Sequence, residues 1–240
     1  MKKLTLGVLL FLLGFSLVSG QKNPDPLGSW TILNIRGKIT GKWEFFYEGQ
    51  ARSIGLYNKF YYYESPKGGI NYNIFKDLSV TVGAGSYNTY KEGGNFERPM
   101  SQREIRVWQQ LTTKSSYGLL KMEHRYRMEQ RFTSNGYRNR YRYRFTSALP
   151  INSKEFKKGT LFSIIWTELF LTNRKPYFER TRLFGGLGYQ FTEVFTLQAG
   201  WINQYDYSLK GDQNRDFIQA TLIFDLDLKS AFGRLPVGEF

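Results

Sequence analysis

The most conspicuous chemistry in the chain is a pair of segments in which charged residues occupy every second position. In EHRYRMEQRF, residues 123–132, one parity holds only Glu and Arg, and in RNRYRYRF, residues 138–145, it holds only Arg. Most of the intervening residues are Tyr, Met or Phe. Guanidinium groups bind carboxylates and phosphates through paired hydrogen bonds, and successive residues of a strand face opposite sides. The spacing therefore predicts two strands with one basic face suited to anions and one aromatic face.

Carboxylates that could compensate the arginines occur at matching parity in the neighbouring segments. Glu104 shares its parity with Arg106 before the pair, and Glu168 follows it. Charged side chains on adjacent strands pair across the sheet. The polar network predicted for the interior comprises Arg125, Arg127, Glu129, Arg131, Arg138, Arg140, Arg142, Arg144, Glu104 and Glu168. The network could simply satisfy a polar interior, or it could line a narrow pore that prefers anions.

The aromatic face is expected to contact lipid. An arginine that faced lipid at the middle of a bilayer would cost about 2–4 kcal/mol, so a whole row of them must point inward. Read as a helix, the same segments would scatter charge around every face. The residues predicted to face lipid are Tyr126, Met128, Phe132, Tyr141, Tyr143, Phe145, Leu222 and Phe224.

The only histidine is the one candidate for nucleophilic catalysis. If Arg131 faces Arg140, then His124 faces Ser147 on the outer wall, as a serine–histidine pair of a lipid-cleaving barrel would require. That pair would lie near the short-turn end, away from exposed lipid. Outer-membrane phospholipases carry a serine two residues after the histidine, and that position here is Tyr126. We therefore predict no catalytic residue and favour an interfacial role for His124.

Composition argues against several other kinds of site. The chain has no Cys and one His, so a zinc or copper site is not expected. The segment GGLG, residues 185–188, lacks the lysine and helix of a phosphate-binding loop, and its glycines are better explained by crowding at a barrel wall. We expect no metal and no cofactor. The formal charge of +14 could suit nucleic acid, but export argues against that partner, and we expect none.

The first twenty residues resemble a cleavable signal peptide. Lys2 and Lys3 precede an apolar run at 4–17 and a small-residue cleavage site at 18–20. The run is shorter than the ~20 residues that a membrane-spanning helix needs. The predicted organisation is a signal peptide at 1–20, a short unstructured leader at 21–27 and one barrel domain at 28–240.

Alternating polarity continues along the rest of the chain. No later apolar run is long enough to span a membrane as a helix, and a closed β-barrel is the other structure that can do so. The predicted strands are residues 29–37, 42–51, 60–74, 78–90, 103–112, 118–132, 138–149, 160–171, 179–191, 195–206 and 215–227. Turns at 38–42, 75–77, 113–116 and 192–194 alternate with longer connections at 51–59, 91–102, 133–137, 171–178 and 207–214, and 151–159 is long on the short-turn side.

These features predict an all-β fold: a closed, antiparallel, up-and-down transmembrane β-barrel. Because bacterial barrels usually have an even number of strands, about twelve strands are expected, with ten as the alternative. A twelfth strand would come from the stretch 51–74 or from the tail 228–240.

Several longer segments resemble a family of outer-membrane barrels from Bacteroidetes-type bacteria, domain of unknown function 2490. The resemblance rests on KWEFFYEGQAR (42–52), GGINYNIFKDLSVTVGAGSY (68–87), HRYRMEQRF (124–132), RYRYRF (140–145), TELFLTNR (167–174) and RLFGGLGYQF (182–191). It implies a barrel in the outer membrane, no established activity and no catalytic residues.

Three functions remain open. The first is a non-enzymatic outer-membrane barrel, either structural or a small channel with a basic lumen. The second is a phospholipase-like hydrolase, and the third is a soluble exported barrel that binds an apolar ligand. The expected partners are outer-membrane lipid, the barrel-assembly machinery and, for a channel, an anionic solute. Cations predicted at strand ends, where they can meet lipid phosphates, are Lys38, Lys42, Lys59, Lys91, Lys175 and Arg174.

Overall fold

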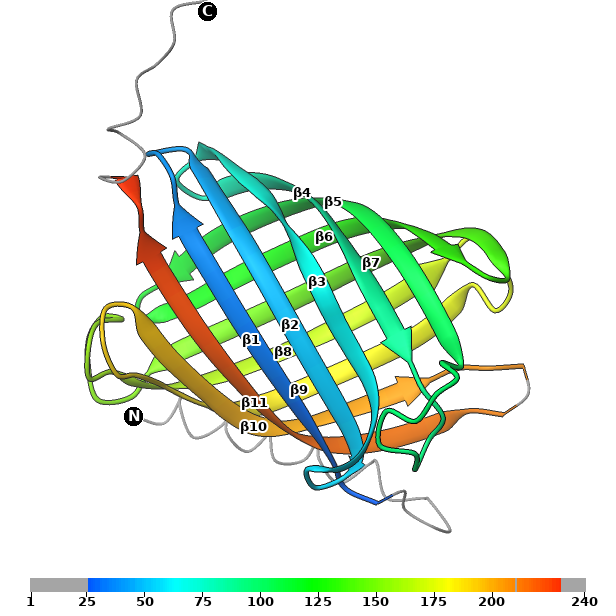
Figure 1. The fold of residues 1–240 in the computed structure, drawn as a ribbon. Coiled ribbons are helices and arrows are strands. Elements are labelled where there is room, and N and C mark those ends of the chain that lie inside the picture. The colour runs from blue at the N-terminus through cyan, green and yellow to red at the C-terminus, as the bar shows by residue number, and fades with distance from the viewer. Residues whose placement is uncertain (1–25, 210, 230–240) are drawn as a thin grey trace, which may run out of the picture.

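A computed structural model describes residues 26–209 and 211–229 of the chain. All of its regular elements are strands (Figure 1). They are β1 (Gly28–Lys38), β2 (Trp43–Gly55), β3 (Asn58–Phe75), β4 (Leu78–Thr89), β5 (Gln102–Tyr117), β6 (Leu120–Thr133), β7 (Gly136–Pro150), β8 (Leu161–Thr172), β9 (Phe178–Gln190), β10 (Phe195–Asp206) and β11 (Gln213–Asp227). In the described ranges, no helix is long and apolar enough to cross a membrane. The expected signal peptide, most of the expected leader and the tail from residue 230 lie outside the described residues.

The strands close into one barrel in chain order, with β1 beside β11. The eleven predicted strands are all present, but the expectation of twelve or ten is not met in the described part of the chain. The barrel is also not antiparallel throughout, because β1 and β11 pair in parallel from Gly28↔Phe217 to Lys38↔Asp227. An odd number of up-and-down strands makes the first and last run in the same direction, so the closing pair must be parallel. Closure leaves no unpaired sheet edge.

The stretch 51–74, one of two segments expected to supply a twelfth strand, forms a hairpin of β2 and β3 instead. Residues predicted as a long connection, 51–59, mostly belong to β2 and β3, and Gly55 pairs with Asn58 around a two-residue turn. Likewise, the turn predicted at 113–116 is part of β5, and the chain reverses at 118–119. Polar residues in these segments suggested loops, but most of them pair with a neighbouring strand, with one irregularity between Arg52 and Ser53.

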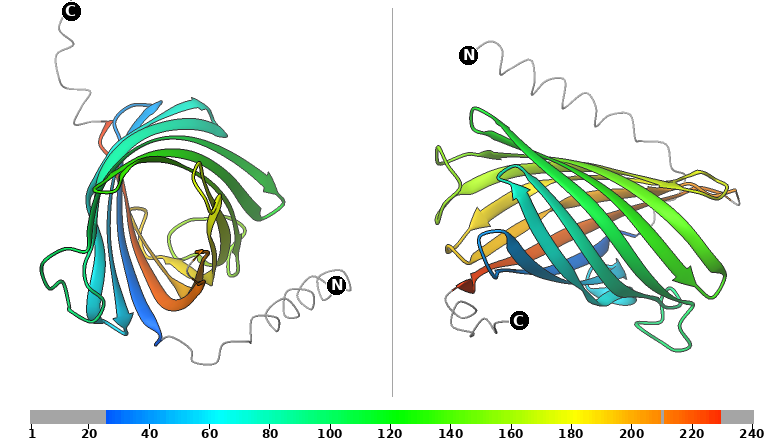
Figure 2. Two further views of the ribbon diagram at one scale, coloured as in Figure 1. Left: turned by 90° about the vertical axis from the view of Figure 1, so that its right-hand side faces the viewer. Right: turned by 90° about the horizontal axis from the view of Figure 1, so that it is seen from above.

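The two rims of the barrel each carry one long connection, so the predicted separation of short turns from long loops is not found. The first rim, where β1 begins, has connections at 56–57, 90–101, 134–135, 173–177 and 207–212. The second rim has connections at 39–42, 76–77, 118–119, 151–160 and 191–194. On the first rim, the segment 90–101 folds back outside the wall (Figure 2), where the Phe96 amide donates to the Phe60 carbonyl at 2.8 Å.

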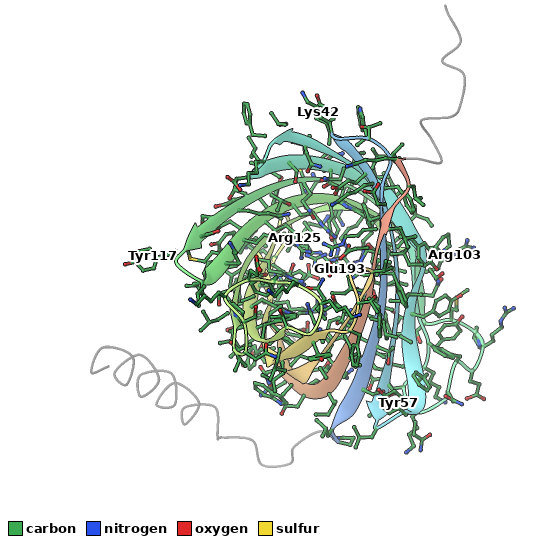
Figure 3. All side chains as sticks on the ribbon, turned by 90° about the vertical axis from the view of Figure 1, so that its left-hand side faces the viewer. Lys42, Tyr57, Arg103, Tyr117, Arg125 and Glu193 are labelled. Carbon is green, nitrogen blue, oxygen red and sulfur yellow. The ribbon has the colours of Figure 1, made fainter. Side chains whose placement is uncertain are left out.

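The segment 151–160 on the second rim is internally bonded and tied to its neighbours. Asn152 Nδ2 donates to the Gly159 carbonyl at 2.9 Å, and the Lys158 amide donates to Glu193 Oε1 at 3.3 Å. Phe156 packs edge-on against Phe162, with ring centroids 5.2 Å apart, and so joins the inner apolar cluster. The segment therefore narrows this mouth. Figure 3 shows the second rim, where Glu193, Lys42 and Tyr117 lie, with Arg125 inside the ring of strands.

The inside of the barrel holds aromatic rings as well as charges. Trp166 stacks on Phe184 with centroids 5.4 Å apart, and Trp30 meets Phe217 edge-on at 5.8 Å. Apolar residues buried in this inner cluster include Trp30, Ile32, Tyr62, Tyr87, Trp108, Phe162, Ile164, Trp166, Phe184, Ile202 and Phe217. Inward-facing rings of this size fill much of the space that a barrel of eleven strands encloses.

Two adjacent glycines on β9 differ sharply in the space beside them. A Cβ at Gly186 would lie 2.4 Å from the Ala199 carbonyl oxygen of β10, whereas a Cβ at Gly185 would meet nothing within 4 Å. We expect Gly186→Ala to destabilise the barrel by about 1–3 kcal/mol, the usual cost of overpacking. Gly185→Ala should change stability by no more than about 0.5 kcal/mol. Urea titration of both refolded variants measures the difference, and equal midpoints would contradict the close approach of β9 and β10.

Candidate functional site

Strands β6 and β7 bring the two arginine-rich segments together with all their charged residues inside. The register pairs Arg131 with Arg138 and Glu129 with Arg140. The predicted pairing of Arg131 with Arg140 is therefore wrong by two residues, because the hairpin turns over residues 134–135 only. Gly136, with φ of +98°, provides the positive φ that such a tight hairpin connection commonly needs.

This register sets arginines directly opposite arginines, and carboxylates from other strands separate the like charges. Arg125 lies opposite Arg144, and Arg127 opposite Arg142. Glu168 on β8 is fully buried and accepts hydrogen bonds from Arg125 at 2.6 Å, Arg142 at 2.7 Å and Arg144 at 2.8 Å. Arg182 of β9 lies 3.7 Å away. One carboxylate thus forms ion pairs with four guanidinium groups.

Glu129 on β6 is a second fully buried carboxylate with several cations around it. It accepts from Arg140 at 2.6 Å and from Arg142 at 2.5 Å. Arg106 and Arg127 approach it to 4.0 and 3.8 Å. Because Arg142 also binds Glu168, it joins the two carboxylates into one continuous network.

The network continues toward the first rim through Glu104 and Glu179. Glu104 forms ion pairs with both Arg106 and Arg131. Glu179 accepts from Arg131 at 3.1 Å and from Arg140 at 3.2 Å. The structure therefore brings together all ten residues predicted for the interior, with Arg138 at its edge, 3.8 Å from Glu179.

Other charged residues of the interior were not predicted from the sequence. Glu179 and Arg180 are neighbours in the chain, and an irregularity in the pairing of β8 with β9 lets both line the cavity. A similar irregularity between Glu64 and Lys67 on β3 lets both side chains line the cavity although their positions differ in parity. Alternation in residues 42–52 would have identified the inward face of β2, which includes Glu48 and Arg52. Parity predicts a face only where a strand is regular.

Aromatic rings provide the second kind of partner for the inner arginines. The guanidinium carbon of Arg52 lies 3.5 Å from the Trp30 ring centroid, and that of Arg106 lies 3.6 Å from Tyr87. Arg144 lies 4.0 Å from the ring centroid of Trp166. Cations over ring faces are attracted by the ring quadrupole, so these contacts hold the guanidinium groups in fixed positions.

A cavity of about 490 Å³ remains among these side chains. Thirteen Lys or Arg and six Glu or Asp side chains line it. Even after Glu129 and Glu168, both fully buried, are added to the acids, five positive charges remain in excess. A second hollow of about 830 Å³ opens at the second rim. The two share the lining residues Thr146, Ile164, Gln198 and Ile223.

The outer wall carries the residues predicted to face lipid. Tyr126 is 49% exposed and Phe132 is 50% exposed, whereas Tyr143, Phe145, Leu222 and Phe224 are half-buried among neighbouring side chains of the same face. Exposed apolar residues on β4 to β8 include Val80, Val82, Ile105, Leu111, Tyr126, Met128, Phe132, Tyr141, Leu169 and Leu171. An exposed apolar face of this extent is typical of a surface that contacts a partner protein or a membrane.

The structure does not form the serine–histidine arrangement considered from the sequence. His124 lies opposite Phe145, and its Nδ1 is 2.9 Å from the Tyr143 hydroxyl. Ser147 lies opposite Met122. Within the described ranges, no group of three or more His, Cys, Asp or Glu residues is placed to hold a metal ion. The chemistry of the interior is therefore that of multiple guanidinium groups around a cavity.

Comparison with known proteins places the chain in a family without naming its activity. The model of a family described as "Protein of unknown function (DUF2490)" matches residues 27–215. No curated protein and no solved structure matches the chain. The matched segment begins before β1 and ends within β11, so it includes nearly the whole barrel.

Proposed function

Since the chain belongs to the DUF2490 family, whose function is unknown, we propose from the geometry that it is a non-enzymatic barrel of the bacterial outer membrane that passes small anions. The observation that carries the proposal is the division of the wall: aromatic and aliphatic residues predominate outside, and a cavity with excess positive charge lies inside. The signal-like first twenty residues support export.

The outer wall supports a membrane rather than an aqueous environment. Inside a bilayer every backbone polar group must be bonded within the protein, and a closed barrel meets that requirement. Many of its strands exceed the 9–11 residues that cross a bilayer at a tilt. A soluble barrel for an apolar ligand would carry its arginines outside, and here Arg127, Arg131 and Arg140 are buried inside.

The cavity supports passage of anions rather than of cations. Fixed positive charges with low-dielectric walls raise the local concentration of anions and exclude cations. Because the hollow at the second rim shares lining residues with the cavity, a solute that enters one can reach the other. The close packing of Phe156 and the inner rings predicts a narrow passage with a small conductance.

Planar-bilayer recording tests this function. We expect the protein to produce small currents whose reversal potential in a salt gradient indicates anion preference. The preference should be stronger in 0.1 M than in 1 M salt, because the screening length falls from about 10 to about 3 Å. Arg138→Glu, at the cavity edge, should lower the anion-to-cation permeability ratio.

The matched control is Arg174→Glu, which makes the same charge change in the connection between β8 and β9, outside the cavity lining. It should leave the permeability ratio close to that of the unaltered protein. The absence of any current from folded, inserted protein would contradict passage and leave a structural barrel. Equal effects of the two variants would show that the interior does not select ions.

A further inference from the structure

Arg52 is a deeply buried cation with incomplete pairing. Its side chain is 5% exposed, and its one carboxylate contact within the described part of the chain is a long one, 3.5 Å to Glu64. One NH2 group also donates to Gln50 Oε1 at 3.2 Å. The Nε–H has no acceptor among the described residues. A buried donor without an acceptor costs about 1–3 kcal/mol, so this position favours an additional acceptor.

Arg182, on the other side of the closing pair of strands, is also short of acceptors. Its Nε donates to Gln204 Oε1 at 2.9 Å. Its nearest carboxylate contact is 3.7 Å, to Glu168, which already accepts hydrogen bonds from three other arginines. Arg180 and Arg52 line the same cavity as Arg182 and add positive charge there. The charge balance is therefore locally positive at Arg182.

Both arginines lie beside the ring system of Trp30. The guanidinium carbons of Arg52 and Arg182 lie 3.5 and 4.8 Å from centroids of its ring system. Both side chains line the same cavity. Gln219 lies in register with Trp30, and its Oε1 has no donor among the described residues. Amide O and N are assigned from hydrogen bonds, so this group can offer either an acceptor or, when turned, a donor.

The other inner arginines show what full compensation looks like. Arg106 binds Glu104 through two nitrogens at 2.8 and 2.9 Å. Arg140 binds Glu129 through two nitrogens at 2.8 and 2.6 Å. Arg52 and Arg182 have no carboxylate contact of that kind. Part of the excess positive charge of the cavity therefore lies beside Trp30, and another part lies at Arg127, whose contact with Glu129 is 3.8 Å.

We propose that Arg52 and Arg182, beside Trp30 and Gln219, form a binding site for one small oxyanion, a carboxylate or a phosphate. The fork of a guanidinium group matches the paired oxygens of these anions, which a spherical anion lacks. A bound oxyanion would accept from the unpaired Nε of Arg52 and reduce the repulsion between the two arginines. The inference deepens the proposed function by naming a ligand class, and it needs solute to enter the cavity but not to cross it.

Calorimetric titration of the folded barrel in detergent tests the site. At constant ionic strength, inorganic phosphate and acetate should each bind saturably with one ion per barrel, and chloride should not. The comparison of phosphate with acetate decides which oxyanion the site prefers. Arg52→Gln and Arg182→Gln should each weaken binding of the preferred ion by at least about ten-fold, as expected for loss of about 1.4 kcal/mol or more.

The control is Arg36→Gln, which removes one positive charge near the second rim, where Arg36 binds Asp225 and does not line the cavity. It should change affinity less than two-fold, on the order of 0.4 kcal/mol. Arg52→Lys and Arg182→Lys keep the charge that balances Glu64 and Glu168 but lose the fork, so they should fold and bind weakly. Circular dichroism and heat-dependent electrophoretic mobility confirm folding of each variant.

Two results would overturn the site. One is the absence of saturable oxyanion binding to the unaltered barrel. The other is an Arg36→Gln variant that loses as much affinity as the cavity variants, which would mean that total charge alone attracts the ion. Because binding is measured without a membrane current, a barrel that binds but does not conduct refutes passage only. A barrel that conducts but does not bind refutes this site only.

Discussion

Replacing Glu168 with glutamine is expected to lower the free energy of unfolding by about 3–5 kcal/mol, the usual result of removing one partner from a buried ion pair. Glutamine keeps the size and one acceptor, but it removes the negative charge that three arginines contact at 2.6–2.8 Å. The arginines would then face one another with Glu129 as the nearest remaining acid. The largest part of the loss is the burial of uncompensated cations.

The measurement is a urea titration of protein refolded into lipid vesicles, followed by the fluorescence of the five tryptophans. Glu155→Gln is the matched control, because Glu155 is 68% exposed and forms an exposed ion pair with Lys157. An exposed pair contributes about 0–1 kcal/mol. Similar midpoints for the two variants would mean that the inner network is not a source of stability and that water replaces the carboxylate readily.

Arginine in place of Tyr126 is expected to cost about 2–4 kcal/mol in a lipid bilayer, the range for a cation at the midplane on the lipid face of a barrel. Tyr126 lies near the middle of β6 and is 49% exposed on the outer wall. Its neighbours in register are Leu111 and Tyr143, neither of which carries a negative charge. The same change in a water-soluble barrel would fall within about 0.5 kcal/mol.

Tyr117→Arg provides the comparison at a strand end. Tyr117 is the last residue of β5, at the second rim, and is 82% exposed. Near the interface an arginine costs only about 0–1 kcal/mol, because it can reach water and lipid phosphates. Urea titrations of both variants in vesicles give the difference in the free energy of unfolding between an arginine at the middle of a strand and one at a strand end. A Tyr126→Arg barrel as stable as the Tyr117→Arg barrel would contradict the proposed membrane environment.

Local alternation in the sequence predicted most of the wall. In a regular strand the side of each residue follows from its parity alone, so the inward arginines of β6 and β7 and the outward Tyr126 and Tyr141 could be assigned without a fold. The same pattern predicted eleven strands, and most of their predicted ends lie within a few residues of the ends in the structure. Rules for even strand numbers in bacterial barrels led from that count to the unmet expectation of twelve.

Pairing between strands depended on information that parity does not contain. The two-residue connection at 134–135 set the register of β6 and β7. The polar residues of this segment did not show whether the connection was that short or longer. Irregular pairing near Glu179 and Lys67 changed which residues share a face. Each of these features arises where backbone geometry departs from a period of two.

The amino-acid sequence by itself determined that this protein has strands with a basic side and an apolar side, because side-chain direction in a strand is a local property. Only the tertiary structure decided which carboxylate neutralises which arginine, and that Arg52, Trp30 and Arg182 meet. These three belong to β2, β1 and β9, which approach one another only when the parallel pair of β1 and β11 closes the barrel. The deficit of negative charge at that point is a consequence of closure.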